Sequence, residues 1–90
     1  MRALLLQAHG DYDQYALRDD LPEPAPAAGE AVVRVAACGL NYLDIFVRRG
    51  MPGLHVPMPR VPGSDVAGTV TAVGAGVDAA WLGRRVLVDP

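Results

Sequence analysis

The 90-residue sequence predicts a mainly β fold, a barrel-like domain with one short helix. Short apolar segments with the length and alternation of strands recur along the chain. A single segment, residues 42–49, has helical periodicity and capping residues at both ends. Ten glycines and eight prolines separate these segments and limit the length of any helix.

The first two strands are expected to pair as a hairpin before a stiff connector. Residues 3–7 form an apolar run that stops at Gly10, and residues 15–19 alternate weakly between apolar and polar side chains. From residue 22 to residue 26, every second residue is proline. Because proline lacks a backbone N–H and disrupts helices, this stretch predicts an extended connector.

Residues 30–38 show the clearest strand pattern in the chain. The apolar face of this strand comprises Val33, Val35 and Ala37. Arg34 falls on the opposite face, as the two-residue period of a strand requires. The pattern ends at Cys38, which we expect to be a buried, unreactive thiol. As the only cysteine, it forms no internal disulfide and supplies no cysteine-rich zinc site.

The helix predicted over residues 42–49 has signals at both ends. Asn41 is a favoured N-cap residue, and Asp44, three positions later, fits a capping box. We expect Arg48 only to complement the negative end of the helix or to pair with Asp44. The predicted apolar face comprises Leu43, Phe46 and Val47.

The second half of the chain predicts a loop and two further strands. Residues 51–63 contain four prolines, so this loop is stiff rather than a flexible linker. Residues 66–73 are strand-like, and Gly68 in their middle indicates a bulge or a close backbone approach. After a glycine-rich turn, residues 85–88 form the last expected strand.

Composition excludes several classes of function. The formal net charge is −2, lysine is absent, and no basic cluster exceeds two adjacent arginines, so no nucleic-acid interface is expected. No apolar run approaches the roughly 18 residues that a membrane span needs. No secretory signal opens the chain, which favours a cytoplasmic location. Five short strands would leave open sheet edges, so we expect the chain to be the front part of a longer protein.

Several stretches resemble signatures of the medium-chain dehydrogenase/reductase superfamily. Ala37–Gly50 is similar to the helix-bearing segment of these enzymes. Val61–Val70, followed by Val73-Gly74 and by Gly83–Val86, is similar to their next signature. The resemblance implies that residues 1–90 are the N-terminal GroES-like segment, a partial barrel, of a two-domain α/β dehydrogenase. The nucleotide-binding Rossmann domain is then absent from this chain.

Differences from the zinc-dependent alcohol dehydrogenases imply one branch of this superfamily. Those enzymes place a cysteine ligand at the position of Asn41, a histidine at Ser64 and a glutamate at Asp65. Asparagine and serine are poor zinc ligands, so no catalytic zinc is expected. Leu43 stands where those enzymes carry a hydroxyl residue of the proton relay. The chain instead resembles the quinone oxidoreductase branch, whose members bear asparagine at the Asn41 position.

This branch transfers hydride from NADPH or NADH to a quinone or an activated carbonyl or enone. Such acceptors are reactive enough to need no metal, so the protein mainly supplies orientation and a pocket. The resemblance implies a cleft for substrate and cofactor that is lined by Asn41, Tyr42, Asp44, Phe46 and Ser64. None of these is assigned as a certain catalytic residue or a metal ligand. The 90-residue segment alone is expected to be inactive because the cofactor is bound mainly by the missing domain.

Other interpretations of the same residues stay open. Helix capping by itself explains Asn41 and Asp44. The whole protein could be a relative of the zinc-containing alcohol dehydrogenases with only a downstream structural zinc. It could also be a stand-alone GroES-type interaction module, although the proline-stiffened residues 51–63 do not resemble the mobile loop of such a module. The expected partners are a small-molecule substrate, the Rossmann domain and, at full length, further copies in a homo-oligomer.

Overall fold

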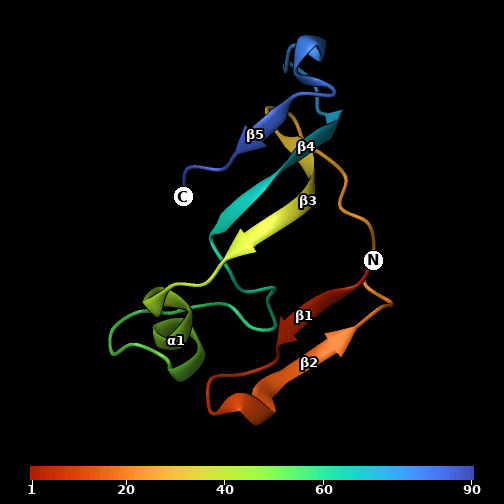
Figure 1. Ribbon diagram of the computed structural model, residues 1–90. Coiled ribbons are helices and arrows are strands. Elements are labelled where there is room, and N and C mark those ends of the chain that lie inside the picture. The colour runs from red at the N-terminus through yellow and green to blue at the C-terminus, as the bar shows by residue number, and fades with distance from the viewer. The chain divides into compact units, whose positions relative to one another are not determined.

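The computed structural model describes residues 1–90, which fold into two compact units. Each unit is assembled from two separate stretches of sequence. Unit 1 contains residues 1–22 and 40–63, and unit 2 contains residues 23–39 and 64–90. The predicted mainly β fold with one helix is confirmed: the strands form a two-stranded and a three-stranded sheet and close no barrel (Figure 1).

Unit 1 is built on a β-hairpin and one helix. Its elements are β1 (Ala3–Leu6), the 3-10 helix η1 (Tyr12–Gln14), β2 (Tyr15–Arg18) and α1 (Tyr42–Arg49). Strands β1 and β2 pair antiparallel, which confirms the expected hairpin. The proline-rich loop is attached to β1, because Leu6 and Arg60 exchange two backbone hydrogen bonds of 2.8 and 3.0 Å. Leu6 is fully buried, and Val56 of the same loop is also buried.

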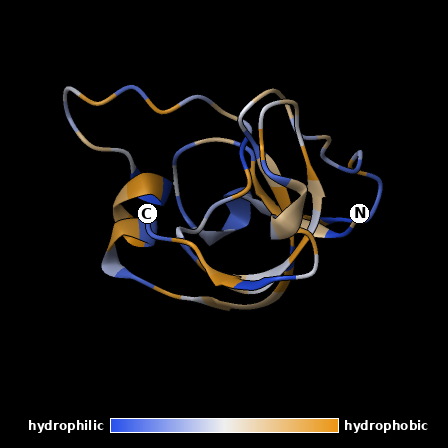
Figure 2. Ribbon diagram, turned by 90° about the horizontal axis from the view of Figure 1, so that it is seen from above, coloured by the Kyte–Doolittle hydropathy of each residue, from blue (hydrophilic) through white to orange (hydrophobic).

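Helix α1 has the bounds that the sequence predicts. The Asp44 carboxylate accepts a hydrogen bond of 2.9 Å from the Asn41 backbone N–H, as in a capping box. At the other end, Gly50 adopts a φ of 89° and donates its N–H to the carbonyl of Phe46 at 2.8 Å. Figure 2 draws the helix largely in the hydrophobic colour.

The predicted apolar face of α1 is only partly correct. Leu43 and Phe46 are about half exposed, and Val47 is half-buried. The most buried side chain of the helix is Arg48, at 3% exposure. The local pattern failed because the burial of Arg48 depends on polar partners from the chain segment between β1 and β2, which no helical period encodes.

Unit 2 is an antiparallel sheet in the order β3-β4-β5. Its elements are β3 (Ala31–Gly39), β4 (Asp65–Val73), the 3-10 helix η2 (Ala79–Trp81) and β5 (Arg85–Leu87). Gly68 and Val70 lie on the buried face of β4, two positions apart as a strand requires. The pairing extends past the strand ends, since Val88 donates its N–H to the carbonyl of Val66 at 2.9 Å.

The prediction for Gly68 is confirmed in both of its forms. The register between β3 and β4 shifts between Val35 and Ala37, beside the pairing of Val35 with Gly68, which is a β-bulge. A methyl group on Gly68 would collide with the carbonyl oxygen of Arg34 and would lie 2.7 Å from Cγ1 of Val33. Only glycine leaves room for this close approach of two backbones.

The expectation that Cys38 is buried is wrong. Its side chain is exposed, as are those of residues 34–37 before it. Strand β3 is an edge strand that pairs only with β4. The alternation in the sequence therefore places the residues on faces correctly without burying them.

None of the helices combines the length and the apolar character that crossing a bilayer would take.

Candidate functional site

A pocket of about 560 Å³ opens beside the first turn of α1 in unit 1. Its lining residues come from η1, from β2 and from one side of the segment 40–48, which includes most of α1: Tyr12, Tyr15, Leu40, Asn41, Tyr42, Asp44, Ile45 and Arg48. Three of the five predicted cleft residues, Asn41, Tyr42 and Asp44, thus lie together in one pocket. The pocket combines aromatic walls with an amide, a carboxylate and a guanidinium.

The geometry of the helix explains which residues line the pocket. Positions three and four residues apart lie on the same side of a helix, and the spacing of Asn41, Asp44, Ile45 and Arg48 follows this rule. Asp44 is held in place because its carboxylate accepts from the backbone N–H of Asn41 at 2.9 Å. The N-terminus of the helix also carries a partial positive charge, which favours the carboxylate here.

The other two predicted cleft residues lie elsewhere. Phe46 of α1 is 48% exposed and does not line the pocket. Ser64 belongs to unit 2 and directly precedes β4. The structure therefore brings three of the five residues together and places Phe46 outside their pocket.

Arg48 is a pocket residue whose role the sequence did not indicate. Its Nη1 donates to the carbonyl oxygen of Gly10 at 2.9 Å and to Oδ1 of Asp11 at 3.3 Å. Its guanidinium carbon lies 4.3 Å from the centre of the Tyr12 ring, a cation–π contact. These partners lie almost forty residues earlier in the chain, so no local pattern could have revealed them.

Further hydrogen bonds attach His9 and Gly10, in the segment between β1 and η1, to the C-terminal end of α1. The backbone N–H of Gly10 donates to the carbonyl of Arg48 at 2.9 Å. Nδ1 of His9 lies 2.8 Å from the carbonyl oxygen of Val47. The carbonyl groups at the C-terminal end of a helix lack partners within the helix, and these contacts satisfy two of them. The C-terminal end of α1 is therefore fixed to this segment by several polar bonds.

A second ion pair of unit 1 lies on the exposed end of β2. Arg18 donates to both carboxylate oxygens of Asp20, at 2.9 and 2.7 Å. These hydrogen bonds lower the pKa of Asp20 below its usual range and raise the pKa of Arg18. Both side chains are solvent-exposed and neither lines the pocket, so this pair belongs to the surface.

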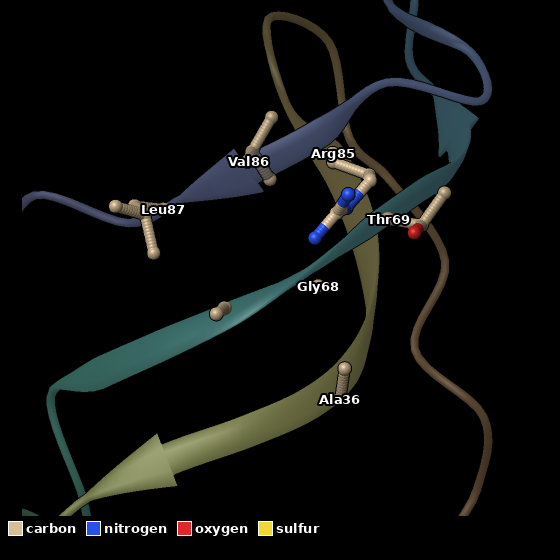
Figure 3. A pocket seen from close by; sticks show the side chains of 7 residues that line it. Ala36, Gly68, Thr69, Arg85, Val86 and Leu87 are labelled. Atoms are coloured by element: carbon tan, nitrogen blue, oxygen red, sulfur yellow. The ribbon is translucent and has the colours of Figure 1, made fainter.

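Unit 2 has a shallow pocket of about 350 Å³ on its sheet (Figure 3). Figure 3 shows the side chain of Arg85 extending from β5 towards β4, with Val86 pointing away from it. The lining residues are Ala36, Ala67, Gly68, Thr69, Arg85, Val86 and Leu87. The only polar side-chain groups in the lining of this pocket are one guanidinium and one hydroxyl. Nowhere in the chain do three histidine, cysteine, aspartate or glutamate side chains gather as metal ligands would.

Comparisons with known proteins bear on the site. Residues 27–90 match the alcohol dehydrogenase GroES-like domain family. The synaptic vesicle membrane protein VAT-1 homologue of Rattus norvegicus is 43% identical over 90 residues, which is 98% of this chain and 22% of that protein. The quinone oxidoreductase of Rattus norvegicus is 37% identical over 86 residues, which is 96% of this chain and 26% of that enzyme.

Solved structures share the fold. A putative alcohol dehydrogenase from Sinorhizobium meliloti has a TM-score of 0.92 at 40% identity, over 99% of this chain and 29% of its own. A mycobacterial protein complexed with NADPH has a TM-score of 0.82 at 36% identity, over 97% of this chain and 27% of its own. An alcohol dehydrogenase from E. coli complexed with NADH has a TM-score of 0.79 at 35% identity, over 100% of this chain and 24% of its own. The chain spans about a quarter of the length of the proteins that it matches.

Proposed function

The chain belongs to the alcohol dehydrogenase GroES-like domain family, and from this premise we propose that it forms the substrate side of an NAD(P)H-dependent oxidoreductase. The acceptor is a quinone or an activated carbonyl or enone, and no catalytic zinc takes part. The enzyme works with a Rossmann domain that holds most of the nicotinamide nucleotide, as part of a protein longer than these 90 residues. The observation that carries the proposal is the pocket at the start of α1, which contains Asn41, Tyr42 and Asp44.

The chain's own groups suit the positioning of an acceptor. Asn41 contributes an amide, which donates a hydrogen bond to the carbonyl oxygen of the acceptor as negative charge develops there. Asp44 fixes the backbone of Asn41 through the 2.9 Å capping bond, so the amide starts from a defined position. Tyr42 and its neighbours line the space in which the acceptor would lie.

Electron balance follows from the class of acceptor. A bound dihydronicotinamide supplies a hydride with both electrons, and a proton from water completes the reduction to a hydroquinone or a saturated ketone. Quinones and enones carry a double bond that is already polarised, so no Lewis acid is needed. The absence of cysteine and histidine at positions 41 and 64, which are Asn41 and Ser64, supports this metal-free chemistry.

The test begins with the intact mass and the reading frame of the whole protein that contains this chain. The purified protein is then assayed for loss of NADPH and of NADH with 1,4-naphthoquinone and 4-phenyl-3-buten-2-one, with the uncatalysed background subtracted. We expect acceptor-dependent oxidation that is unchanged after dialysis against a chelator. Zinc-dependent alcohol oxidation that the chelator abolishes would assign the protein to the metal-containing branch instead.

Two substitutions at Asn41 separate its capping role from its role towards the acceptor. Serine is as good an N-cap as asparagine but lacks the amide donor. We expect Asn41→Ser to retain the thermal stability of the protein and to lower kcat/KM by roughly 100-fold, the effect of losing one donor to a developing oxyanion. Asn41→Ala should lower both the thermal stability and kcat/KM. Full activity of Asn41→Ser would show that Asn41 only caps the helix.

A further inference from the structure

Aromatic side chains dominate one side of the unit 1 pocket. All three tyrosines of the chain, Tyr12, Tyr15 and Tyr42, line it. Tyr12 is the one whose ring has a defined partner within the chain, and it is 71% exposed. The hydride-transfer proposal gives these rings no task beyond lining the space for the acceptor.

Tyr12 is held in place by two polar contacts that share one carboxylate. Its backbone N–H donates to Oδ1 of Asp11 at 2.9 Å, and the same oxygen accepts from Nη1 of Arg48 at 3.3 Å. The guanidinium of Arg48 lies over the ring at 4.3 Å from its centre. Arg48 is itself 3% exposed and is anchored by the carbonyl of Gly10 at 2.9 Å. A surface aromatic residue is thus backed by an almost fully buried cation.

This arrangement leaves one face of the Tyr12 ring available. Arg48 covers one face, and the high exposure of the side chain requires that the other face is largely open. A fixed aromatic ring with one open face, at the edge of a pocket, suits offset stacking with a second flat ring. A saturated ring of the same size is thicker and lacks the quadrupole of an aromatic ring, so it binds less strongly to the face of Tyr12.

We propose that Tyr12 is a specificity-determining residue that selects acceptors that carry a flat aromatic ring, and that Arg48 is the positioning residue that holds Tyr12 for this task. The proposal rests on the proposed function, since it names the class of acceptor for the same pocket. It goes further by assigning selectivity to a residue of η1 rather than to Asn41, which precedes α1.

The direct test is equilibrium binding without cofactor, so that no turnover is needed. The probes are 4-phenyl-2-butanone and 4-cyclohexyl-2-butanone, which differ only in whether the ring is aromatic. With the whole protein, calorimetry should show tighter binding of the phenyl ketone. In Tyr12→Leu this preference should fall by roughly 2- to 12-fold, the range expected for one aromatic pair. Tyr12→Phe should retain it, because the stacking face is kept.

Substitutions of Arg48 test the positioning role. Arg48→Lys keeps the charge but loses the planar group that stacks on Tyr12. Arg48→Lys should bring the affinities for the phenyl and the cyclohexyl ketone closer together. If Arg48 had a purely structural role, the substitution would weaken the binding of both ketones equally. Arg18→Lys is the matched control, because Arg18 is an exposed arginine of the same unit that does not line this pocket. It should leave both affinities unchanged.

The outcomes separate this proposal from the proposed function. If the ratio of the two affinities is the same in the wild type and in Tyr12→Leu, the selectivity proposal is overturned, whatever the enzyme activity. If the ratio changes as expected but no acceptor supports NAD(P)H oxidation, the aromatic site stands and the oxidoreductase proposal fails. Kinetic assays with 4-phenyl-3-buten-2-one and its cyclohexyl analogue then ask whether the same preference appears in KM.

Discussion

Arg48 is the residue at which local pattern and tertiary structure differ most. In sequence it is a cation in the last turn of a helix, a common and weakly stabilising position. In the structure it is 3% exposed and bonded to Gly10, Asp11 and the Tyr12 ring. Its contribution depends on residues that only the fold brings near.

Replacing Arg48 should therefore destabilise the protein more than replacing a surface arginine. Arg48→Met removes a charged hydrogen bond to the carbonyl of Gly10, and we expect a loss of about 1.5–3 kcal/mol in the free energy of unfolding. Urea unfolding of the whole protein measures it. Arg18→Met, which breaks only the exposed pair with Asp20, should shift the midpoint little. Equal shifts in the two variants would contradict the structural role of Arg48.

Gly68 gives a second prediction at the residue scale. Gly68→Ala would push a methyl group into the carbonyl oxygen of Arg34, and backbone cannot move aside as a side-chain tip can. We expect a loss of about 1–3 kcal/mol in the free energy of unfolding. Thr71→Ala on the same strand is the control, because Thr71 is exposed and its hydroxyl makes one long hydrogen bond of 3.4 Å. If Gly68→Ala left the free energy of unfolding unchanged, the two strands would be able to separate locally.

These residues show what a single sequence can and cannot predict. Gly68 was predictable because glycine inside a strand is itself an unusual local signal. Arg48 and Cys38 were misjudged because burial is decided by what packs on an element, and the partners are distant or missing on that side. Asn41 and Asp44 line one pocket, since helical spacing puts them on the same side, but their role in a substrate cleft stays a prediction.

At the scale of elements, local signals were more reliable. The hairpin, the three strands of unit 2 and the helix all lie where the sequence predicts them, with ends that differ by a residue or two. The 3-10 helices η1 and η2 were not anticipated, because three residues are too few to show any periodicity. One of them carries Tyr12, so the least predictable element supplies part of the pocket wall.

The N-terminus of α1 provides a test at this scale. Asp44→Ala removes the carboxylate that accepts from the Asn41 backbone N–H, and it also removes a negative charge from the positive end of the helix. We expect a loss of about 1 kcal/mol in the free energy of unfolding, measured with urea. Asp19→Ala, in the exposed turn after β2, should have no measurable effect. Equal stability of the two variants would mean that the capping bond is not made in solution.

The whole chain is organised by long-range connections. Each unit combines an early and a late stretch, so the chain passes between the units three times within 90 residues. In unit 2, β4 is the central strand and carries the buried Val70, whereas β3 and β5 each keep an unpaired edge. Apolar side chains are exposed on both edge strands: Val35 is 56% and Leu87 is 83% exposed.

The proposed oxidoreductase implies that a polypeptide of these 90 residues alone does not catalyse hydride transfer. It presents the acceptor pocket at α1, but effective catalysis needs the nicotinamide held at a defined distance from the acceptor. We expect loss of NADPH with 1,4-naphthoquinone at the uncatalysed rate. The whole protein, measured in parallel, is the control. A rate above background for the 90-residue polypeptide would contradict the division of roles between this chain and a nucleotide-binding domain.

The same polypeptide should also self-associate in solution. Unpaired strand edges template pairing with another chain, and the edges of β3 and β5 lack the charges and prolines that normally block it over Val35–Cys38 and Val86–Val88. We expect light scattering to show a mass that rises with concentration. Leu87→Lys, which puts a charge on the exposed edge strand, should reduce this association, whereas Leu17→Lys on the exposed side of the hairpin should reduce it less. A polypeptide that stays monomeric at high concentration would mean that these edges are protected within the 90 residues, and the open-edged sheet would then be the wrong description of unit 2.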